Sequence, residues 1–553
     1  MKPRIIVDRI VVGGGTAGCL LAAKLSDDFS KSVLLIEGGS NRVRDKEVLA
    51  ANFFEAGKIA NNPKYSKTYQ ANYVPGQPIT YADGDGLGGG SMHNGEQAVR
   101  GTRTMWDKWA MLTGDDRWSY DNLLEKVMKP LENYTPSGTE ANYNERGDNG
   151  ALYISQEPPI NKDPLIQIIS HVTGAPLVPD TNDSSYGDIG LSSNQNWVTP
   201  PWNTPGSVRS FSANAFLTGN PSVGTPPIIN PDGSSIDPRR QLTVLFDSIC
   251  NRVLFDQNGD AYAVEFFSTE QKQMVIAYAR LLVILCTGSV CDAAILQRSG
   301  VGDPKLLASL NIPIVVANPL VGQGLQNHNG SAAVLAPGGK YPYTIKFPQI
   351  GSGFIDLKPY MSPGVRRMQL IIVPSPFTPP GINQVLNIPK NSTSVIGLNI
   401  TPSSRGSVKI VSQNPFVDPI IELNSYSDGD LNTEGTDAYK IVSFYKIMRE
   451  VARIAETEIL FPTPDDYADN SGNRLLKCAL SSAPTPAYHN SSTCRMGTSL
   501  ENSVCDSLLN VRRVGKLKVA SNAAAPDVIE DGNTAYQAFM IGAMAYLIIS
   551  EGL

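Results

Sequence analysis

The glycine-rich turn near the start of the chain restricts the fold more than any other feature of the sequence. Gly13, Gly15 and Gly18 stand between two apolar runs, at residues 5–12 and 33–36. The apolar runs predict buried strands, and the residues between them predict a tight turn followed by a helix. This order is typical of α/β proteins whose parallel sheet binds a dinucleotide.

Each part of this unit suits a nucleotide. Gly13 permits the tight turn, Gly15 lets a pyrophosphate approach the backbone, and Gly18 lets the helix pack on the strand. The helix presents free N–H groups and its positive end to the phosphates. Glu37 ends the second strand, where it can accept hydrogen bonds from a ribose. A glycine-rich turn without a ligand is the alternative interpretation.

Charge and cysteine content exclude several other classes. The 553 residues include 46 basic and 52 acidic side chains, for a net charge of −6, with no basic block. The electrostatic footprint of a nucleic-acid-binding protein is therefore missing. The seven cysteines are scattered without a CxxC pair, so we expect neither a disulfide framework nor a metal site.

The rest of the chain predicts a second domain inserted into the first. Asn-, Ser- and Pro-rich segments at 158–205 and 219–239 are interpreted as surface excursions. The apolar residues at 539–549 are too few to span a bilayer and predict a buried helix. Further strands are predicted at 242–246, 368–373, 394–400 and 408–411, and helices at 293–297, 303–310 and 437–456.

Several segments together resemble the glucose-methanol-choline (GMC) family of flavoprotein oxidoreductases. The first glycine loop is similar to the family's FAD-pyrophosphate loop, and residues 87–94 resemble a second glycine loop that passes the flavin ring. The other matching segments are Arg100-Gly101 with Trp109, Gly288-Ser289, residues 299–302, residues 321–328, His489 with residues 493–497, and Gly532-Asn533-Thr534.

The resemblance implies FAD and a mixed α/β (α+β overall) architecture. A Rossmann-like FAD-binding domain is expected from residues 1–155, 205–330 and 485–553. A substrate-binding domain, built on an antiparallel sheet that covers the reactive face of the flavin, is expected from residues 156–204 and 331–484. Implied cofactor-binding residues are Gly13, Gly15, Thr16, Ala17, Gly18, Glu37, Gly88, Gly89, Ser91, His93, Asn94, Cys250, Asn522, Asn533 and Thr534.

Histidines carry the chemistry that the resemblance implies. His489 matches the family's catalytic position, and imidazole is a suitable base for the hydroxyl proton of an alcohol. Asn533 is expected to hold the substrate oxygen, a role that is compatible with capping the helix that follows it. His93 either bonds covalently to the flavin or packs beside it. His328 resembles a structural histidine, and His171 is interpreted as a surface or boundary residue.

The chain also departs from the family's pattern. Ser521-Asn522-Ala523 stands where the family usually has Asp-Ala-Ser, so one acidic anchor close to FAD is absent. Asp292-Ala293 stands where Ser/Thr-Pro/Ser is usual, and Asn327 replaces an Asp. Asn490-Ser491-Ser492 replaces Pro-x-Gly after the catalytic histidine. These changes indicate a divergent member that keeps His489 and Asn533.

The resulting expectation is an FAD-dependent oxidoreductase that oxidises a primary alcohol by hydride transfer to flavin N5. Its partners are then a small-molecule alcohol and oxygen or another electron acceptor, and self-association stays open. The alternatives are a lyase that contains FAD, and a structural protein of the giant-virus type with weak or no redox activity. No secretion signal precedes the first strand, which favours an intracellular or virion-associated location.

Overall fold

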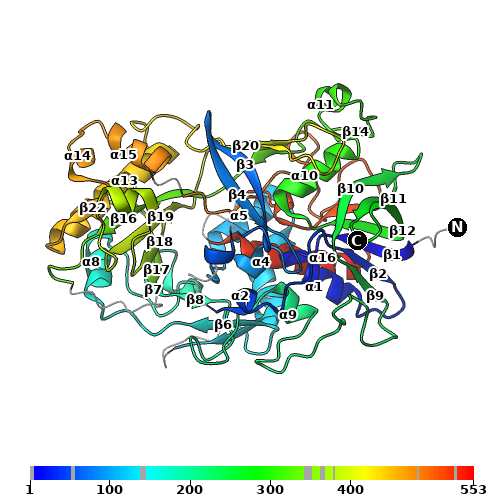
Figure 1. Ribbon diagram of the computed structural model, residues 1–553, viewed down its shortest axis with the longest axis horizontal. Coiled ribbons are helices and arrows are strands. Elements are labelled where there is room, and N and C mark those ends of the chain that lie inside the picture. Colours follow the sequence, from blue (N-terminus) through cyan, green and yellow to red (C-terminus); the bar gives the residue numbers. More distant parts are fainter. Residues whose placement is uncertain are drawn as a thin grey trace.

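A parallel sheet and an antiparallel sheet occupy opposite sides of the molecule, to the right and left of Figure 1. The computed structural model describes residues 5–51, 57–60, 62–137, 145–341, 351–361, 368–377, 380–482, 485–527 and 532–553.

The parallel sheet begins with the predicted dinucleotide unit. β1 (Ile5–Val12), α1 (Thr16–Leu25) and β2 (Val33–Ile36) follow one another as the sequence predicts. β1 lies between β2 and β12 (Gln273–Leu285), and β9 (Leu242–Leu245) extends the sheet beside β2. On its other side, β12 pairs first with antiparallel β11 (Ala261–Ser268), itself beside β10 (Ser248–Phe255), and then with parallel β23 (Leu517–Val519).

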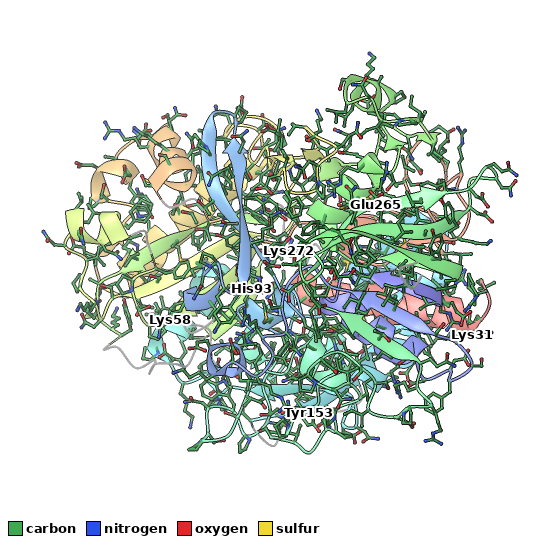
Figure 2. The ribbon with its side chains drawn as sticks, turned by 45° about the vertical axis from the view of Figure 1, so that its right-hand side comes forward. Lys31, Lys58, His93, Tyr153, Glu265 and Lys272 are labelled. Carbon is green, nitrogen blue, oxygen red and sulfur yellow. The ribbon has the colours of Figure 1, made fainter. Side chains whose placement is uncertain are left out.

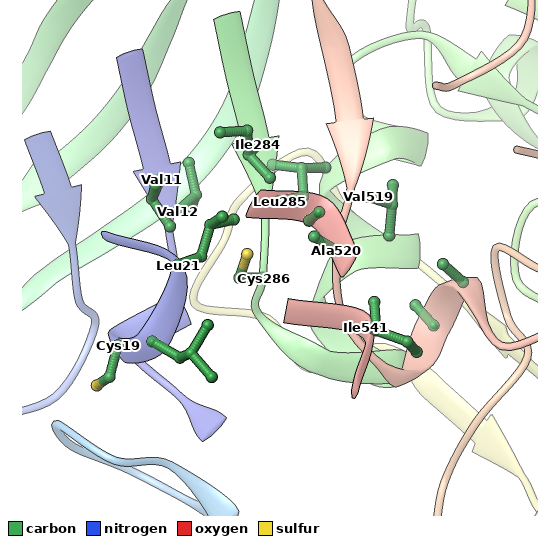
Figure 3. Close-up of a cluster of buried hydrophobic side chains, with 14 of the residues drawn as sticks. Val11, Val12, Cys19, Leu21, Ile284, Leu285, Cys286, Val519, Ala520 and Ile541 are labelled. Carbon is green, nitrogen blue, oxygen red and sulfur yellow. The ribbon is translucent and has the colours of Figure 1, made fainter. Parts of the chain in front are cut away.

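Apolar packing holds this sheet between helices. α16 (Thr534–Ser550) packs on α1, and Gly542 comes so close that an added Cβ would lie 3.0 Å from the Cα of Ala17. Figure 3 shows Val12, Leu285 and Ile541 in one cluster of buried side chains, where all three are at most 1% exposed. The predicted buried helix at 539–549 is therefore confirmed as part of α16. None of the described helices is long and apolar enough to cross a membrane.

The antiparallel sheet is buried on both faces. One face, with Leu370 and Val395, packs in a cluster with α13 (Asp437–Ile454) and α8 (Pro164–Thr173). Alternate residues form a separate apolar cluster on the other face. The strand order is β22 (Ile459–Phe461), β16 (Asn329–Leu335), β19 (Thr393–Asn399), β18 (Met368–Val373), β17 (Gly351–Ile355) and β7 (Gly190–Ser193).

A third sheet joins the two predicted domains. β20 (Gly406–Lys409) and β21 (Ile420–Glu422) fall inside the range 331–484, yet they pair with strands from the range predicted to bind FAD. The chain thus passes between the FAD-binding and substrate-binding parts more often than the predicted domain boundaries describe. The order is β15 (Gln323–Leu325), β20 (Gly406–Lys409), β21 (Ile420–Glu422), β3 (Ser66–Val74) and β4 (Gln77–Gly84).

Shorter elements complete the described chain. The helices predicted at 293–297 and 303–310 are α10 (Gly288–Arg298) and α11 (Pro304–Ser309). The remaining strands are β5 (Glu132–Thr135), β6 (Leu152–Gln156), β8 (Gln195–Asn196), β13 (Val301–Gly302) and β14 (Val316–Ala317). The remaining α-helices are α2 (Lys46–Leu49), α4 (Gly90–His93), α5 (Arg103–Thr113), α6 (Tyr120–Leu123), α7 (Lys129–Leu131), α9 (Ser212–Phe216), α12 (Pro380–Val385), α14 (Pro464–Tyr467) and α15 (Asn473–Lys477).

The interpretation of residues 158–205 as a surface excursion is wrong. This segment contains α8, which starts with Pro164 in its first turn and ends before Gly174 at φ +70°. The Asp163 side chain caps the helix by accepting hydrogen bonds from the N–H groups of its first turn. Leu165, Ile166 and Ile169 then bury one face against the antiparallel sheet.

A buried ionic network ties α16 to the segments around it. Glu132 pairs with Arg100 at 2.5 Å and with Arg146 at 3.1 Å, and Arg146 also pairs with Asp180 at 2.9 Å. The hydroxyl of Tyr536, in the first turn of α16, donates to Glu132 at 2.6 Å. All of these charged side chains are at most 5% exposed. Their ion-pair partners must therefore replace the hydration that burial removes.

Candidate active site

A cavity of about 640 Å³ opens at the carboxyl ends of β1 and β12, where open parallel sheets bind their ligands. Both glycine loops line it, as do residues of β18 and β19 from the antiparallel sheet. His93, one of the lining residues, lies near the lower end of the β3–β4 hairpin in Figure 2. The cavity therefore lies between the two predicted domains.

The first glycine loop has the geometry that a bound pyrophosphate requires. At Gly13 an added Cβ would lie 2.7 Å from the carbonyl oxygen of Cys286, and at Gly18 it would collide with the carbonyl of Gly13. Both positions therefore serve the tight packing of β1, α1 and β12. At Gly15 the nearest atoms are 3.8 Å away, and this residue lines the cavity. Gly15 thus leaves a cradle that phosphate oxygens can enter.

Glu37 lies on the cavity wall, with one carboxylate oxygen bonded to this loop and the other bonded to the turn that follows β2. The N–H of Gly14 donates to one oxygen at 2.6 Å, and the N–H of Gly39 donates to the other at 2.8 Å. Burial raises the pKa of Glu37 to about 7, against the lowering effect of the two hydrogen bonds. Each oxygen keeps a lone pair that can accept from a ribose hydroxyl.

The second glycine loop is bonded directly to the first. The N–H of Gly88 donates to the carbonyl of Gly14 at 2.7 Å, and the Ser91 hydroxyl donates to the carbonyl of Gly88 at 2.6 Å. Gly89 lines the cavity, whereas Gly88, Ser91 and Gly18 do not. These last three residues hold the shape of the loops behind the wall.

His93 and Asn94 end the second loop. His93 Nδ1 lies 3.5 Å from the Ser66 hydroxyl, and burial lowers the pKa of His93 to about 4. Arg209 donates to both the carbonyl and the side-chain oxygen of Asn94, each at 2.8 Å. Arg209 is itself buried and pairs with Glu96 at 3.2 Å. This pair supports the loop, and no motif in the local sequence had indicated it.

His489 lines the same cavity and contacts a second histidine. Its Nδ1 lies 2.8 Å from Nδ1 of His328, which is fully buried, and its backbone N–H donates to the side chain of Asn327 at 2.7 Å. One of the two Nδ1 atoms must carry the shared proton. Burial lowers the pKa of His489 to about 4, so the ring is neutral at pH 7.

Asn533 reaches the cavity from the start of α16. It occupies the expected N-cap position, but its side chain makes no capping hydrogen bond. Instead its Nδ2 donates to Gln97 at 3.3 Å, and Gln97 also accepts from Gln369 on β18 at 3.0 Å. The side-chain oxygen of Asn533 is buried with no hydrogen-bond partner among the described residues. It can accept from a ligand.

Of the other residues named in the sequence analysis, some line this cavity and His171 lies on the surface. Cys250, Asn522, Thr534, Thr16 and Ala17 line the cavity. The side-chain N–H of Asn522 also donates to the carbonyl of Thr534 at 3.1 Å. His171 is exposed on α8, away from the cavity lining.

No sequence motif predicted the residues that the antiparallel sheet contributes to the cavity wall. Ile371, Ile396 and Leu398 line the cavity and belong to the apolar cluster on that face of the sheet. They come from two strands that pair in register, Ile371 beside Ile396. Residues on separate strands become neighbours only through this pairing, which local sequence does not specify.

The fold and the site define a class of protein. A parallel-sheet dinucleotide cradle meets a neutral histidine and an apolar wall across one cavity, which is the arrangement of a dinucleotide-dependent oxidoreductase. The cavity residues fit FAD, because the open side of Gly15, the carboxylate of Glu37 and the second glycine loop face a single space.

Comparison with known proteins identifies the family. The N-terminal model for GMC oxidoreductases matches residues 7–169 and 237–330, and the C-terminal model matches residues 402–542. The chain therefore belongs to the GMC oxidoreductase family and is an FAD-dependent oxidoreductase. The resemblance seen in the motifs and the expectation of FAD are both confirmed.

Similar proteins extend over nearly the whole chain. GMC oxidoreductase family protein Mala s 12 of Malassezia sympodialis is 27% identical, over 94% of this chain and 88% of its own length. Oxygen-dependent choline dehydrogenase of Yersinia pseudotuberculosis is 28% identical, over 94% and 90%.

Solved structures show the same fold. Pyridoxine 4-oxidase from Mesorbium loti has a TM-score of 0.79 at 22% identity, and covers 99% of both chains. A fungal aryl-alcohol oxidase has a TM-score of 0.78 at 18% identity, and covers 100% of both. The predicted α/β fold class, with mixed and antiparallel sheets, is confirmed.

Proposed function

We propose that the protein oxidises a primary alcohol, with His489 as the base that removes the hydroxyl proton. The observation that carries the proposal is that His489 and Asn533 line the same cavity as residues of the second glycine loop. FAD, when bound, accepts the carbon-bound hydrogen as a hydride at flavin N5. The protein must then supply proton removal and orientation.

In this proposal the proton shared by the two histidines belongs to His489. When the N–H at Nδ1 of His489 donates to Nδ1 of His328, the lone pair of His489 stands at Nε2, on the opposite side of the ring. This nitrogen takes the hydroxyl proton. The positive charge that then develops on His489 strengthens its hydrogen bond to His328, because a charged donor binds a neutral acceptor more strongly.

Asn533 orients the same substrate oxygen. Its amide keeps one N–H and its oxygen free of protein partners among the described residues, while Gln97 holds the group in place. Two contacts on one hydroxyl fix the carbon relative to the cofactor, which removes much of the entropic barrier to hydride transfer.

The apolar wall favours an uncharged alcohol. Ile371, Ile396 and Leu398 face the cavity, and Tyr488 packs against Tyr81 beside them, with ring centroids 5.1 Å apart. A charged substrate group on this wall would lose its hydration without a compensating partner. The fungal aryl-alcohol oxidase that shares the fold is named for an aromatic alcohol, which agrees with the proposal.

Anaerobic flavin reduction tests the proposal. The purified holoprotein is mixed without oxygen with matched primary alcohols: an aromatic alcohol, an aliphatic alcohol and choline. We expect the aromatic or aliphatic alcohol to bleach the visible flavin absorbance. A flavin that every alcohol leaves oxidised would contradict the proposal and favour a lyase or a structural role. Turnover without bleaching would indicate the lyase.

A further inference from the structure

A buried carboxylate lies behind the cavity wall, at a position where the chain departs from the family's pattern. Asp292 lies on α10, just after β12, and is 0% exposed. One of its oxygens accepts from the backbone N–H of Thr287 at 2.8 Å and from the Thr287 hydroxyl at 2.5 Å. The other accepts from the Ser521 hydroxyl at 2.6 Å.

These hydrogen bonds join two neighbouring strands where the cofactor binds. Thr287 follows β12 and Ser521 follows β23, and the two strands are paired in parallel. Both residues line the cavity, whereas Asp292 stands behind them. The carboxylate therefore clamps two segments of the cofactor wall from inside the protein.

Further hydrogen bonds connect this clamp, formed by Asp292, Thr287 and Ser521, to the start of α16. The Ser521 hydroxyl accepts from the N–H of Ala523 at 3.0 Å, which shapes the short turn that presents Asn522 to the cavity. Asn522 in turn donates to the carbonyl of Thr534 at the start of α16. A change at Asp292 is thus transmitted to residues that face the cofactor.

A carboxylate at this place is costly. No cation pairs with Asp292 in the described part of the chain, and burial raises its pKa to about 6, although hydrogen bonds from Thr287 and Ser521 oppose the rise. A buried charge without a counterion destabilises a fold unless hydrogen bonds compensate it. Its presence therefore indicates a role beyond filling space.

The sequence around the clamp suggests what that role is. Position 521 carries a hydroxyl where the resemblance to the family implies an acid, and position 292 carries an acid where the resemblance implies a hydroxyl. The structure shows that these two positions are hydrogen-bonded to each other. The acid and the hydroxyl have exchanged places across a single hydrogen bond.

We propose that Asp292 is the residue that positions the FAD-binding wall, supplying from α10 the acid that is absent at position 521. It holds the Thr287 and Ser521 segments in the arrangement that receives the cofactor. The inference concerns FAD binding and is independent of whether the substrate is an alcohol.

A reciprocal exchange tests the proposal. Three variants are compared with the natural chain: Asp292→Ser, Ser521→Asp, and the double variant with both changes. FAD affinity is measured by titrating the full-length apoprotein and following flavin fluorescence, and the melting temperature of each apoprotein is recorded. Asp303→Ser is the matched control, because Asp303 caps exposed α11 by accepting from the N–H of Lys305 and does not line the cavity.

Each single change should weaken FAD binding by about tenfold to a hundredfold. Asp292→Ser leaves the Ser521 hydroxyl without its charged acceptor, a bond typically strong enough for such a change. Ser521→Asp places a second carboxylate beside Asp292, where like charges repel. In the double variant an acid at 521 can accept from a serine at 292 and still cap Ala523, so FAD affinity should return to within about threefold of the natural value.

Two outcomes would overturn the proposal. One is FAD affinity in Asp292→Ser equal to that of the natural chain. The other is an FAD affinity of the double variant that is lowered by the combined loss of the two single variants. Asp303→Ser should lower the melting temperature without changing FAD affinity, which separates positioning from general stability. If Asp292→Ser does not fold, Asp292→Asn takes its place, because the amide keeps the size of the side chain and loses the charge.

Discussion

Replacing His489 should slow flavin reduction while the cofactor remains bound. His489→Ala removes the ring that lines the cavity and contacts His328 at 2.8 Å. Loss of a positioned base typically lowers the rate on the order of 10²- to 10⁴-fold, equivalent to about 3–5 kcal/mol in the activation barrier. His171→Ala is the matched control, because that histidine is exposed on α8 outside the cavity lining.

The pH dependence of flavin reduction gives a second test of His489, through its pKa. Burial lowers the pKa of His489 from 6.5 to about 4, which corresponds to about 3 kcal/mol in favour of the neutral ring. The neutral form accepts the proton and is present above the pKa. The reduction rate should therefore stay level from pH 8 to about pH 5 and fall only as the pH approaches 4.

Anaerobic stopped-flow spectrophotometry with a saturating active alcohol measures both effects. The holoprotein, His489→Ala and His171→Ala are compared across this pH range, and their flavin spectra before mixing verify equal loading with FAD. Reduction of His489→Ala at the natural rate would refute the assignment of the base. A rate that instead falls with a midpoint near 6.5 would contradict the lowered pKa of His489.

Three other perturbations address the cofactor and the scaffold. Gly15→Leu should abolish or greatly weaken FAD binding with the circular dichroism spectrum retained, because the new side chain would fill the phosphate cradle; full FAD affinity would show that the loop does not receive phosphates. If His93 is bonded to FAD, acid precipitation should leave yellow colour in the pellet, and His93→Ala should release it; colour only in the supernatant of the natural protein would show that His93 packs beside the ring. Glu132→Ala should lower the free energy of unfolding by about 3–5 kcal/mol, because Arg100 and Arg146 would lose a buried partner; an unchanged urea midpoint would show that the network does not stabilise the fold.

Local sequence determined the elements whose signals lie within a few residues. The bounds of β1 and β2 match the predicted apolar runs, because each run and the turn beside it can be recognised within a few residues. Each glycine of the first loop stands where a side chain would collide with neighbouring atoms or block the phosphate cradle. α8 also had such a signal, in Asp163 before Pro164 and in Gly174 at the end. The polar composition around it concealed that signal.

Family motifs then indicated the residues expected to touch the cofactor and the substrate, but not how they are held there. His489 and Asn533 stand in separate motifs, and the sequence places neither His328 beside the first nor Gln97 beside the second. The structure brings His328 to His489 across 161 positions and Gln97 to Asn533 across 436. The tautomer of the base and the orientation of the amide depend on these partners.

Only the tertiary structure decided the contacts between distant segments. Asp292 and Ser521 are 229 positions apart, and each is a departure from the family's pattern when considered alone. They meet because β12 and β23 are neighbours in the parallel sheet, and their carboxyl ends therefore share one edge. A buried carboxylate is stable only where donors surround it, and those donors come from chain segments that folding alone brings together.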